Sequence, residues 1–167
     1  MGKAIMSRRV RHSASVAAFA VAALGAAVSA SADDSINTGY FGGVAIMGYD
    51  PVAYFTEGKA VKGSEAISYD WLGTPWYFAS EQDREMFKTD PVKYAPQYGG
   101  YCAGEVANGS VTINVDPEAF KIIDGKLYLI YDSGNAASFA ANEEALVPKA
   151  SANWPKVKSD LDSDEFH

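Results

Sequence analysis

The sequence has almost no cysteine and almost no histidine. Its 167 residues include one cysteine, Cys102, and two histidines, His12 and His167, which lie near the two ends. A single thiol cannot close a disulfide within the chain. Without a core histidine, neither a Ser-His-Asp triad nor a Cys-His pair can be assembled. A histidine-rich zinc or copper site is excluded for the same reason.

Long hydrophobic runs are also missing. The longest apolar run covers residues 16–28, which is too short and too rich in alanine for a membrane span. Four basic residues precede it, and Ala30-Ser31-Ala32 follows it with the small side chains that a signal peptidase accepts. Residues 1–32 are therefore predicted to be a cleaved secretory signal peptide. A periplasmic or secreted protein is expected, with no stable membrane insertion once this segment is removed.

Positive charge is scarce in the remaining chain, residues 33–167. It holds 10 Lys and Arg against 21 Asp and Glu, which gives a formal charge of −11. Such a chain is not expected to bind nucleic acid, and it would be repelled by anionic lipid. Its length predicts one domain with one core.

Two β-hairpins stand out in this domain. Residues 66–80 alternate apolar and polar side chains on both sides of a turn at 72–75. In residues 119–132, two arms rich in β-forming residues flank Asp124-Gly125, a pair favoured in two-residue turns. The fold class predicted is α+β, with a small antiparallel sheet formed by the two hairpins and short helices packed on it. A short strand is expected at 44–46.

Helix boundaries follow from capping patterns. Ser80 precedes a helix with capping-box spacing, and the Asp-Pro pairs at Asp50, Asp90 and Asp116 predict helix caps or turns. A helix over 135–147 should end at Pro148. Residues 33–38 are expected to be frayed. The domain should end near residue 157, and the acidic tail 158–167 should be disordered.

Several motifs together resemble a known family. They are GYDPVAYF (48–55), WYFAS (76–80), FKTDPVKYAPQYGGYCA (87–103), DGKLYLIYD (124–132) and ANWP (152–155). The chain resembles a YHS-domain protein of the exported, single-domain branch over roughly residues 40–157. The resemblance implies a small α+β module within residues 33–157. It also implies kinship with cysteine-rich modules thought to bind or sense metals.

The metal-binding members carry cysteines that this chain lacks. Ala53 and Tyr54 stand where those members have Cys-Gly, and Ala79 and Asp83 replace the two cysteines of a Phe-Cys-Ser-x-x-Cys motif. The histidine of the family name also has no counterpart near Trp76. The soft-ligand cluster is absent, so the family's metal-binding label transfers poorly.

Cys102, in the stretch YGGYCAGEVANG (98–109), is open to three interpretations. It is a small buried core residue, a ligand to a metal ion or haem, or a reactive thiol. A metal site would need further ligands from Met47, Met86, Asp50, Glu105 or a tyrosine oxygen, and Met47 and Asp50 are the candidates taken with Cys102. A glycine pair at 99–100 forms a tight turn or lets the backbone approach something closely.

Tyrosines gather in the same motifs. Tyr49, Tyr54, Tyr98 and Tyr101, with Cys102, form the candidate ligand-binding set, as an aromatic pocket with polar tips. Ordinary core packing is the alternative for all four tyrosines.

Two functions from different classes follow. The first is an exported YHS-like binding module, without enzymatic activity, that holds a metal ion, a haem or another small ligand near Cys102. An envelope protein partner is a further expectation. The alternative is a thiol-dependent redox enzyme or redox partner that acts through Cys102.

Overall fold

The computed structural model describes Met1 and residues 35–163. The predicted signal peptide, apart from Met1, lies outside the described residues, and so do residues 164–167. The helices and strands in chain order are η1 (Ala45–Gly48), α1 (Ala53–Thr56), β1 (Ser64–Trp71), β2 (Thr74–Phe78), α2 (Glu81–Thr89), α3 (Pro91–Tyr94), η2 (Gln97–Gly100), α4 (Ala103–Asn108), β3 (Asp116–Ile123), β4 (Lys126–Ile130), α5 (Ser133–Ala141) and α6 (Glu143–Asp162).

The first hairpin pairs β1 with β2 in antiparallel register. Its turn is Leu72-Gly73, shorter than the predicted 72–75, and both residues have positive φ (55° and 71°). Two-residue turns of this kind match the right-handed twist of the arms. Along β2 the side chains alternate in burial, and Trp76 and Phe78 are completely buried. The predicted hairpin is confirmed.

The second hairpin pairs β3 with β4 around Asp124-Gly125, as predicted. The two turn residues again have positive φ, at 50° and 71°. All residues of β4 after Lys126 are buried, so this strand is covered on both faces.

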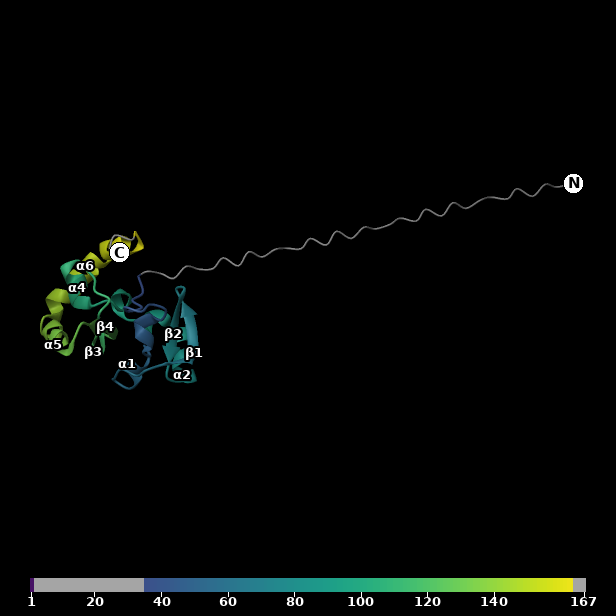
Figure 1. Ribbon diagram of the computed structural model, residues 1–167, viewed down its shortest axis with the longest axis horizontal. Helices are drawn as coiled ribbons and strands as arrows, with labels where there is room; N and C mark the ends of the chain where they lie inside the picture. The colour runs from purple at the N-terminus through teal and green to yellow at the C-terminus, as the bar shows by residue number, and fades with distance from the viewer. Residues whose placement is uncertain (2–34, 164–167) are drawn as a thin grey trace.

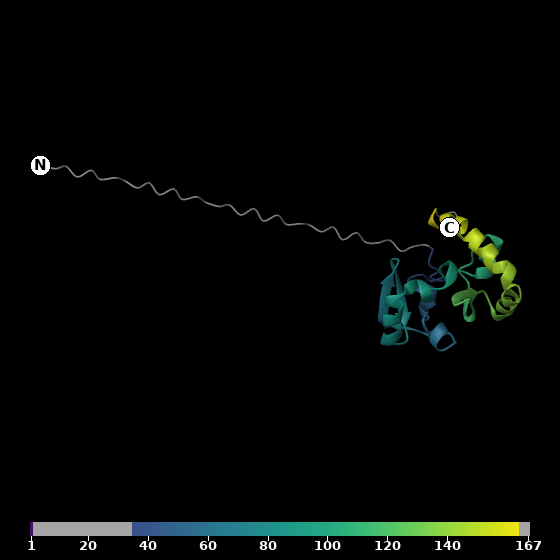
Figure 2. The same ribbon diagram turned by 180° about the vertical axis from the view of Figure 1, so that it is seen from behind.

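The two hairpins stay apart as separate two-stranded sheets. Figures 1 and 2 show β1, β2 and α2 on one side of the molecule, and β3, β4, α4, α5 and α6 on the other. The predicted α+β class is confirmed, while the β-structure is divided between the two sides.

The predicted caps are present. The Ser80 hydroxyl accepts from the Asp83 N–H at 3.0 Å, and the Asp90 carboxylate accepts from the Lys93 N–H at 3.2 Å. Asp116 forms a turn by accepting from the Glu118 N–H. Asp50 instead forms a turn before α1: it accepts from the Val52 and Ala53 N–H groups, while the helix begins at Ala53 with Val52 at its N-cap.

Residues 35–46 differ from expectation. The predicted strand at 44–46 is instead the 3-10 turn η1, with positive φ at Ile46. Ser35 and Asn37, predicted to be frayed, are buried. The Asn37 amide donates to the carbonyls of Gly100 (3.1 Å) and Ile113 (3.2 Å), which ties this segment to the middle of the chain.

The C-terminal helices also differ. The predicted single helix over 135–147 is divided at Asn142, and α6 continues through Pro148 and Pro155 to Asp162. Each proline removes one helical hydrogen bond. The helix also buries Val157 and Leu161, and the burial of these apolar side chains offsets the lost hydrogen bonds. Residues 158–162, predicted as a disordered tail, are therefore helical.

Candidate functional site

Cys102 lies between the short helix η2 and α4. It directly precedes α4 and is only 3% exposed. Its thiol is free.

The turn before Cys102 is tightly packed against another part of the chain. Tyr98, Gly99 and Gly100 all have positive φ. A side chain at Gly99 would overlap the Ser35 carbonyl, and one at Gly100 would lie 2.7 Å from Ile46. Of the alternatives for the glycine pair, close backbone approach is therefore the one observed, and it is made to residues 35–46 of the same chain.

Cys102 also borders a pocket of about 440 Å³ between α4, β4, α5 and the start of α6. We call it the Cys102 pocket. Its lining residues are Cys102, Gly104, Glu105, Asn108, Thr112, Ile130, Tyr131, Asn135, Ser138, Phe139 and Leu146. Its volume lies in the range of small-molecule sites.

The pocket lining combines apolar and polar residues. Ile130 and Phe139 are buried apolar residues, whereas Asn108, Asn135 and Ser138 are exposed polar residues. An apolar body combined with a few polar groups is the usual composition of a ligand site. Sequence reasoning missed these residues, because Ile130, Asn135, Ser138 and Phe139 come near Cys102 only through the packing of α4 and α5 against β4.

Tyr98 and Tyr101 lie beside Trp154, with ring centres 5.7 and 6.4 Å from it. The Tyr98 hydroxyl is 3.0 Å from the Ser151 hydroxyl. Burial raises the pKa of Tyr98, and this hydrogen bond opposes the shift. Neither tyrosine lines the Cys102 pocket.

Tyr49 and Tyr54 are placed elsewhere. Tyr54 is completely buried, donates to the Pro117 carbonyl at 3.0 Å, and packs edge-on against Phe120. Burial raises its pKa. Tyr49 lies under the Lys62 ammonium, 4.5 Å from the ring centre. The four candidate tyrosines therefore do not line one common pocket with Cys102.

The candidate metal ligands are likewise separated. Met47 lines a different pocket from Cys102, beside Tyr40, Phe41 and Val44. Among the described residues, no three His, Cys, Asp or Glu side chains are grouped in a way that could hold a metal ion.

Asp50, the third metal candidate, uses both carboxylate oxygens to accept hydrogen bonds from backbone N–H groups. It is completely buried, one carboxylate oxygen accepts from Val52 (2.8 Å) and Ala53 (3.3 Å), and the other accepts from Ala79 (2.7 Å). Burial raises its pKa to about 6, against the lowering effect of these hydrogen bonds. The carboxylate connects α1 to the loop between β2 and α2.

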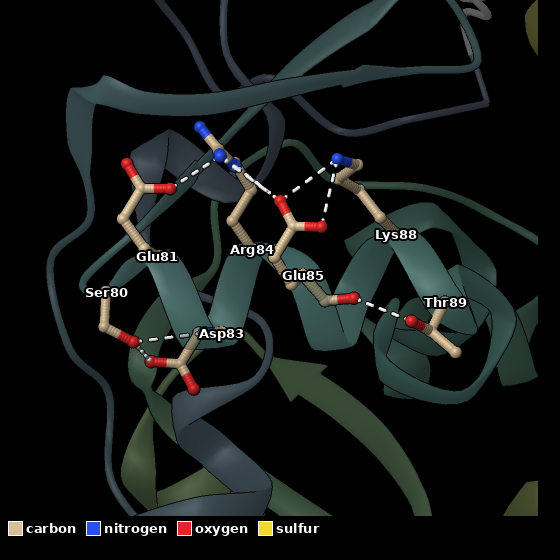
Figure 3. A network of polar contacts seen from close by, with 7 residues as sticks. All are labelled: Ser80, Glu81, Asp83, Arg84, Glu85, Lys88 and Thr89. Atoms are coloured by element: carbon tan, nitrogen blue, oxygen red, sulfur yellow. Dashed lines mark hydrogen bonds and ion pairs between the residues drawn. The ribbon is translucent and has the colours of Figure 1, made fainter.

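The charged face of α2 is a second polar cluster (Figure 3). Arg84 pairs with Glu81 at 2.5 Å, and Lys88 pairs with Glu85 at 3.0 Å. The hydrogen bond from Lys88 lowers the pKa of Glu85. The carboxylates here are more than half exposed, and surface ion pairs of this kind contribute little stability. We interpret the face as solvated surface.

The chain was compared with protein-family models, with curated proteins and with solved structures, and none of them matches it. The YHS resemblance therefore stays a prediction from motifs. Within the part of the chain that the structure describes, no helix has the length and apolarity needed to cross a bilayer.

Proposed function

We propose that the protein is an exported, YHS-like binding module that holds a small ligand in the Cys102 pocket. The observation that carries the proposal is the position of the single cysteine at a pocket with a buried apolar floor and a polar rim. The pocket has a volume suited to a small molecule, and the described residues form no catalytic histidine site.

The pocket is poorly suited to a closed metal site. Cys102 and Glu105 are the only lining residues with a thiol or carboxyl group, and no lining residue is histidine or methionine. Structural zinc sites use four protein ligands. A metal ion or a haem held here would need its remaining ligands from water or from a second molecule.

A thiol-dependent redox activity is the second candidate. It is favoured by the fact that Cys102, although 3% exposed, borders a pocket that small molecules can enter. The chain contains no second cysteine to resolve an oxidised thiol. A redox role would therefore need an external thiol.

Export can be tested on the full chain. We propose that cleavage follows Ala32 and that the mature protein is periplasmic or secreted. Expression of the full chain, followed by intact mass measurement of the exported protein, should give a chain that begins at Asp33. A retained segment 1–32 in the exported fraction would contradict this.

The ligand is tested by native mass spectrometry and elemental analysis of the exported protein. Three forms are compared: the wild type, Cys102→Ala, and the control Met47→Leu, which alters a different pocket. Bound mass or metal that is lost only in Cys102→Ala supports a ligand at this pocket. Bound material that all three forms retain equally would place the ligand elsewhere, and bare protein in all three would count against a tightly held ligand.

A further inference from the structure

We infer that the Cys102 pocket selects small amphipathic organic cations, with an ammonium group at its polar rim and an apolar body on its floor. This inference rests on the proposed function, because it names the ligand class of the same pocket. It is carried by the charges and hydrogen bonds of the lining residues.

The rim holds one charge, and that charge is negative. Glu105 is the only charged residue among those that line the pocket, and no Lys, Arg or His lines it. The Ser110 hydroxyl donates to Glu105 Oε2 at 2.8 Å. That bond holds the carboxylate in place, and an ionised carboxylate can accept further donors.

Asn135 adds a second acceptor. Its side-chain amide nitrogen donates to Asp132 Oδ2 at 2.9 Å, and the Asn135 N–H donates to the other oxygen of Asp132 at 2.7 Å. This bond uses one N–H of the Asn135 amide, and the amide carbonyl oxygen can accept a hydrogen bond from a ligand. Asp132 also places another carboxylate directly behind this rim residue.

The other polar groups of the rim, such as the Asn108 amide and the Thr112 and Ser138 hydroxyls, can both donate and accept. The negative charge of Glu105 is therefore the feature that distinguishes a cation from a neutral or anionic ligand. A ligand that supplies several N–H donors and a positive charge matches this arrangement, and a charged hydrogen bond is stronger than a neutral one. An anion would face Glu105 without a compensating cation. The formal charge of −11 on residues 33–167 also favours the approach of cations.

The floor requires an apolar body. Ile130 is 1% exposed and Phe139 is 2% exposed, and the half-buried Leu146 lies beside them. The Cys102 sulfur is a soft, polarisable atom that packs favourably on aromatic or aliphatic groups. A simple inorganic cation would leave this floor uncovered.

The test uses three probes with the same aromatic body: 2-phenylethylammonium, 2-phenylethanol and 3-phenylpropionate. Each is titrated into the exported protein, and binding is followed by two-dimensional NMR of the backbone amides in α4, β4 and α5. The variants are Glu105→Gln, Asn135→Ala and the control Glu65→Gln, which removes one exposed charge from β1 on the other side of the molecule.

We expect the ammonium probe to bind about fivefold to tenfold more tightly than the alcohol, and the carboxylate probe to bind most weakly. Glu105→Gln should bring the ammonium and the alcohol to similar affinity, Asn135→Ala should reduce the preference, and Glu65→Gln should leave it unchanged. Continued binding of the alcohol to Glu105→Gln shows that the pocket is intact in that variant.

Two results would overturn the inference, and they differ in what they leave standing. If the alcohol or the carboxylate binds at the pocket as tightly as the ammonium, the cation preference is wrong while a small-ligand site remains. If no probe shifts amides around the pocket, the inference and the proposed small-ligand pocket fail together.

Discussion

The two hairpins of this protein have similar turns but differ in what packs beside them. Both turn through two residues with positive φ, and both pair antiparallel arms. Around the first hairpin, the Phe87 ring packs against Trp71, Trp76 and Phe78 at 5.1 to 5.6 Å and fills the space. Around the second, the Cys102 pocket remains open beside Ile130.

The difference comes from the helices that cover each hairpin. On the first hairpin the Phe87 ring of α2 packs against the aromatic side chains of β1 and β2, whereas Gly104, Asn135 and Ser138 of α4 and α5 face the space beside β4. Close packing of the Phe87 ring fills the space between α2 and the first hairpin, while the smaller residues beside β4 leave a cavity. The local sequence of a hairpin therefore does not decide whether it seals a core or borders a site.

The largest effect is expected at the turn that joins the two sides. Gly99→Ala would place a methyl group on the Ser35 backbone, at a φ of 60° that disfavours side chains. We expect a loss of about 3 kcal/mol or more, or no folded protein at all. Urea unfolding or the yield of folded protein measures this.

The matched control is Gly125→Ala in the second hairpin turn. Its φ is also positive, at 71°, but nothing lies within 4 Å of the new side chain. A loss of about 1 kcal/mol is expected from backbone strain alone. Equal losses at Gly99 and Gly125 would show that the close approach to Ser35 is not the decisive feature.

The stability of the aromatic cluster around Phe87 should depend strongly on that ring. Phe87→Ala removes a completely buried side chain among four aromatic neighbours, and a loss of about 3 to 5 kcal/mol is expected. Leu146→Ala, at the edge of the Cys102 pocket, should cost about 1 kcal/mol, since that side chain is only half-buried. Similar losses for both variants in denaturant unfolding would remove the contrast between the two sides.

The buried carboxylate of Asp50 predicts that the free energy of unfolding depends on pH. The pKa of Asp50 is raised from 3.8 to about 6 in the folded protein, so between these values the folded state binds more protons than the unfolded state. The contribution of this group to the free energy of unfolding therefore falls as pH rises from 4 to 6, by on the order of 3 kcal/mol. It is constant outside this window.

Asp50→Asn tests this directly. The amide has no titration, so the fall between pH 4 and 6 should disappear from unfolding curves measured across this range. Because the amide nitrogen cannot accept from the Ala79 N–H, a loss of about 1 to 3 kcal/mol is also expected at pH 4. A wild-type slope that the substitution leaves unchanged would assign the titration to other groups.

The sequence predicted the parts of the fold that depend on local chemistry. The Asp124-Gly125 turn and the caps at Ser80 and Asp90 need only neighbouring residues, and all three are present. Residues 35–37 and 158–162 were wrongly assigned as unstructured, because their order comes from distant contacts. Asn37 is held by residues 63 and 76 positions away, and α6 is stabilised by burial of Val157 and Leu161.

The site was predictable only in part. Cys102 was identified because it is the only cysteine, and it does border a pocket. The tyrosines and Met47 were grouped with it on sequence proximity to shared motifs, a criterion that cannot tell which side of a packed element a residue occupies. Glu105 is near Cys102 in sequence, but Asn135 and Ser138 reach the pocket only through tertiary packing.

Only a small effect on stability is expected at Cys102 itself, and the reactivity of its thiol separates the remaining interpretations. Cys102→Ala removes one buried sulfur at the wall of an existing pocket, so a loss of about 1 kcal/mol is expected in unfolding experiments. The free thiol of the wild type should react slowly with iodoacetamide and quickly after unfolding, because only 3% of the residue is exposed. Fast alkylation of the native protein would favour the redox alternative, whereas slow alkylation that an ammonium probe slows further would place the ligand directly against the sulfur.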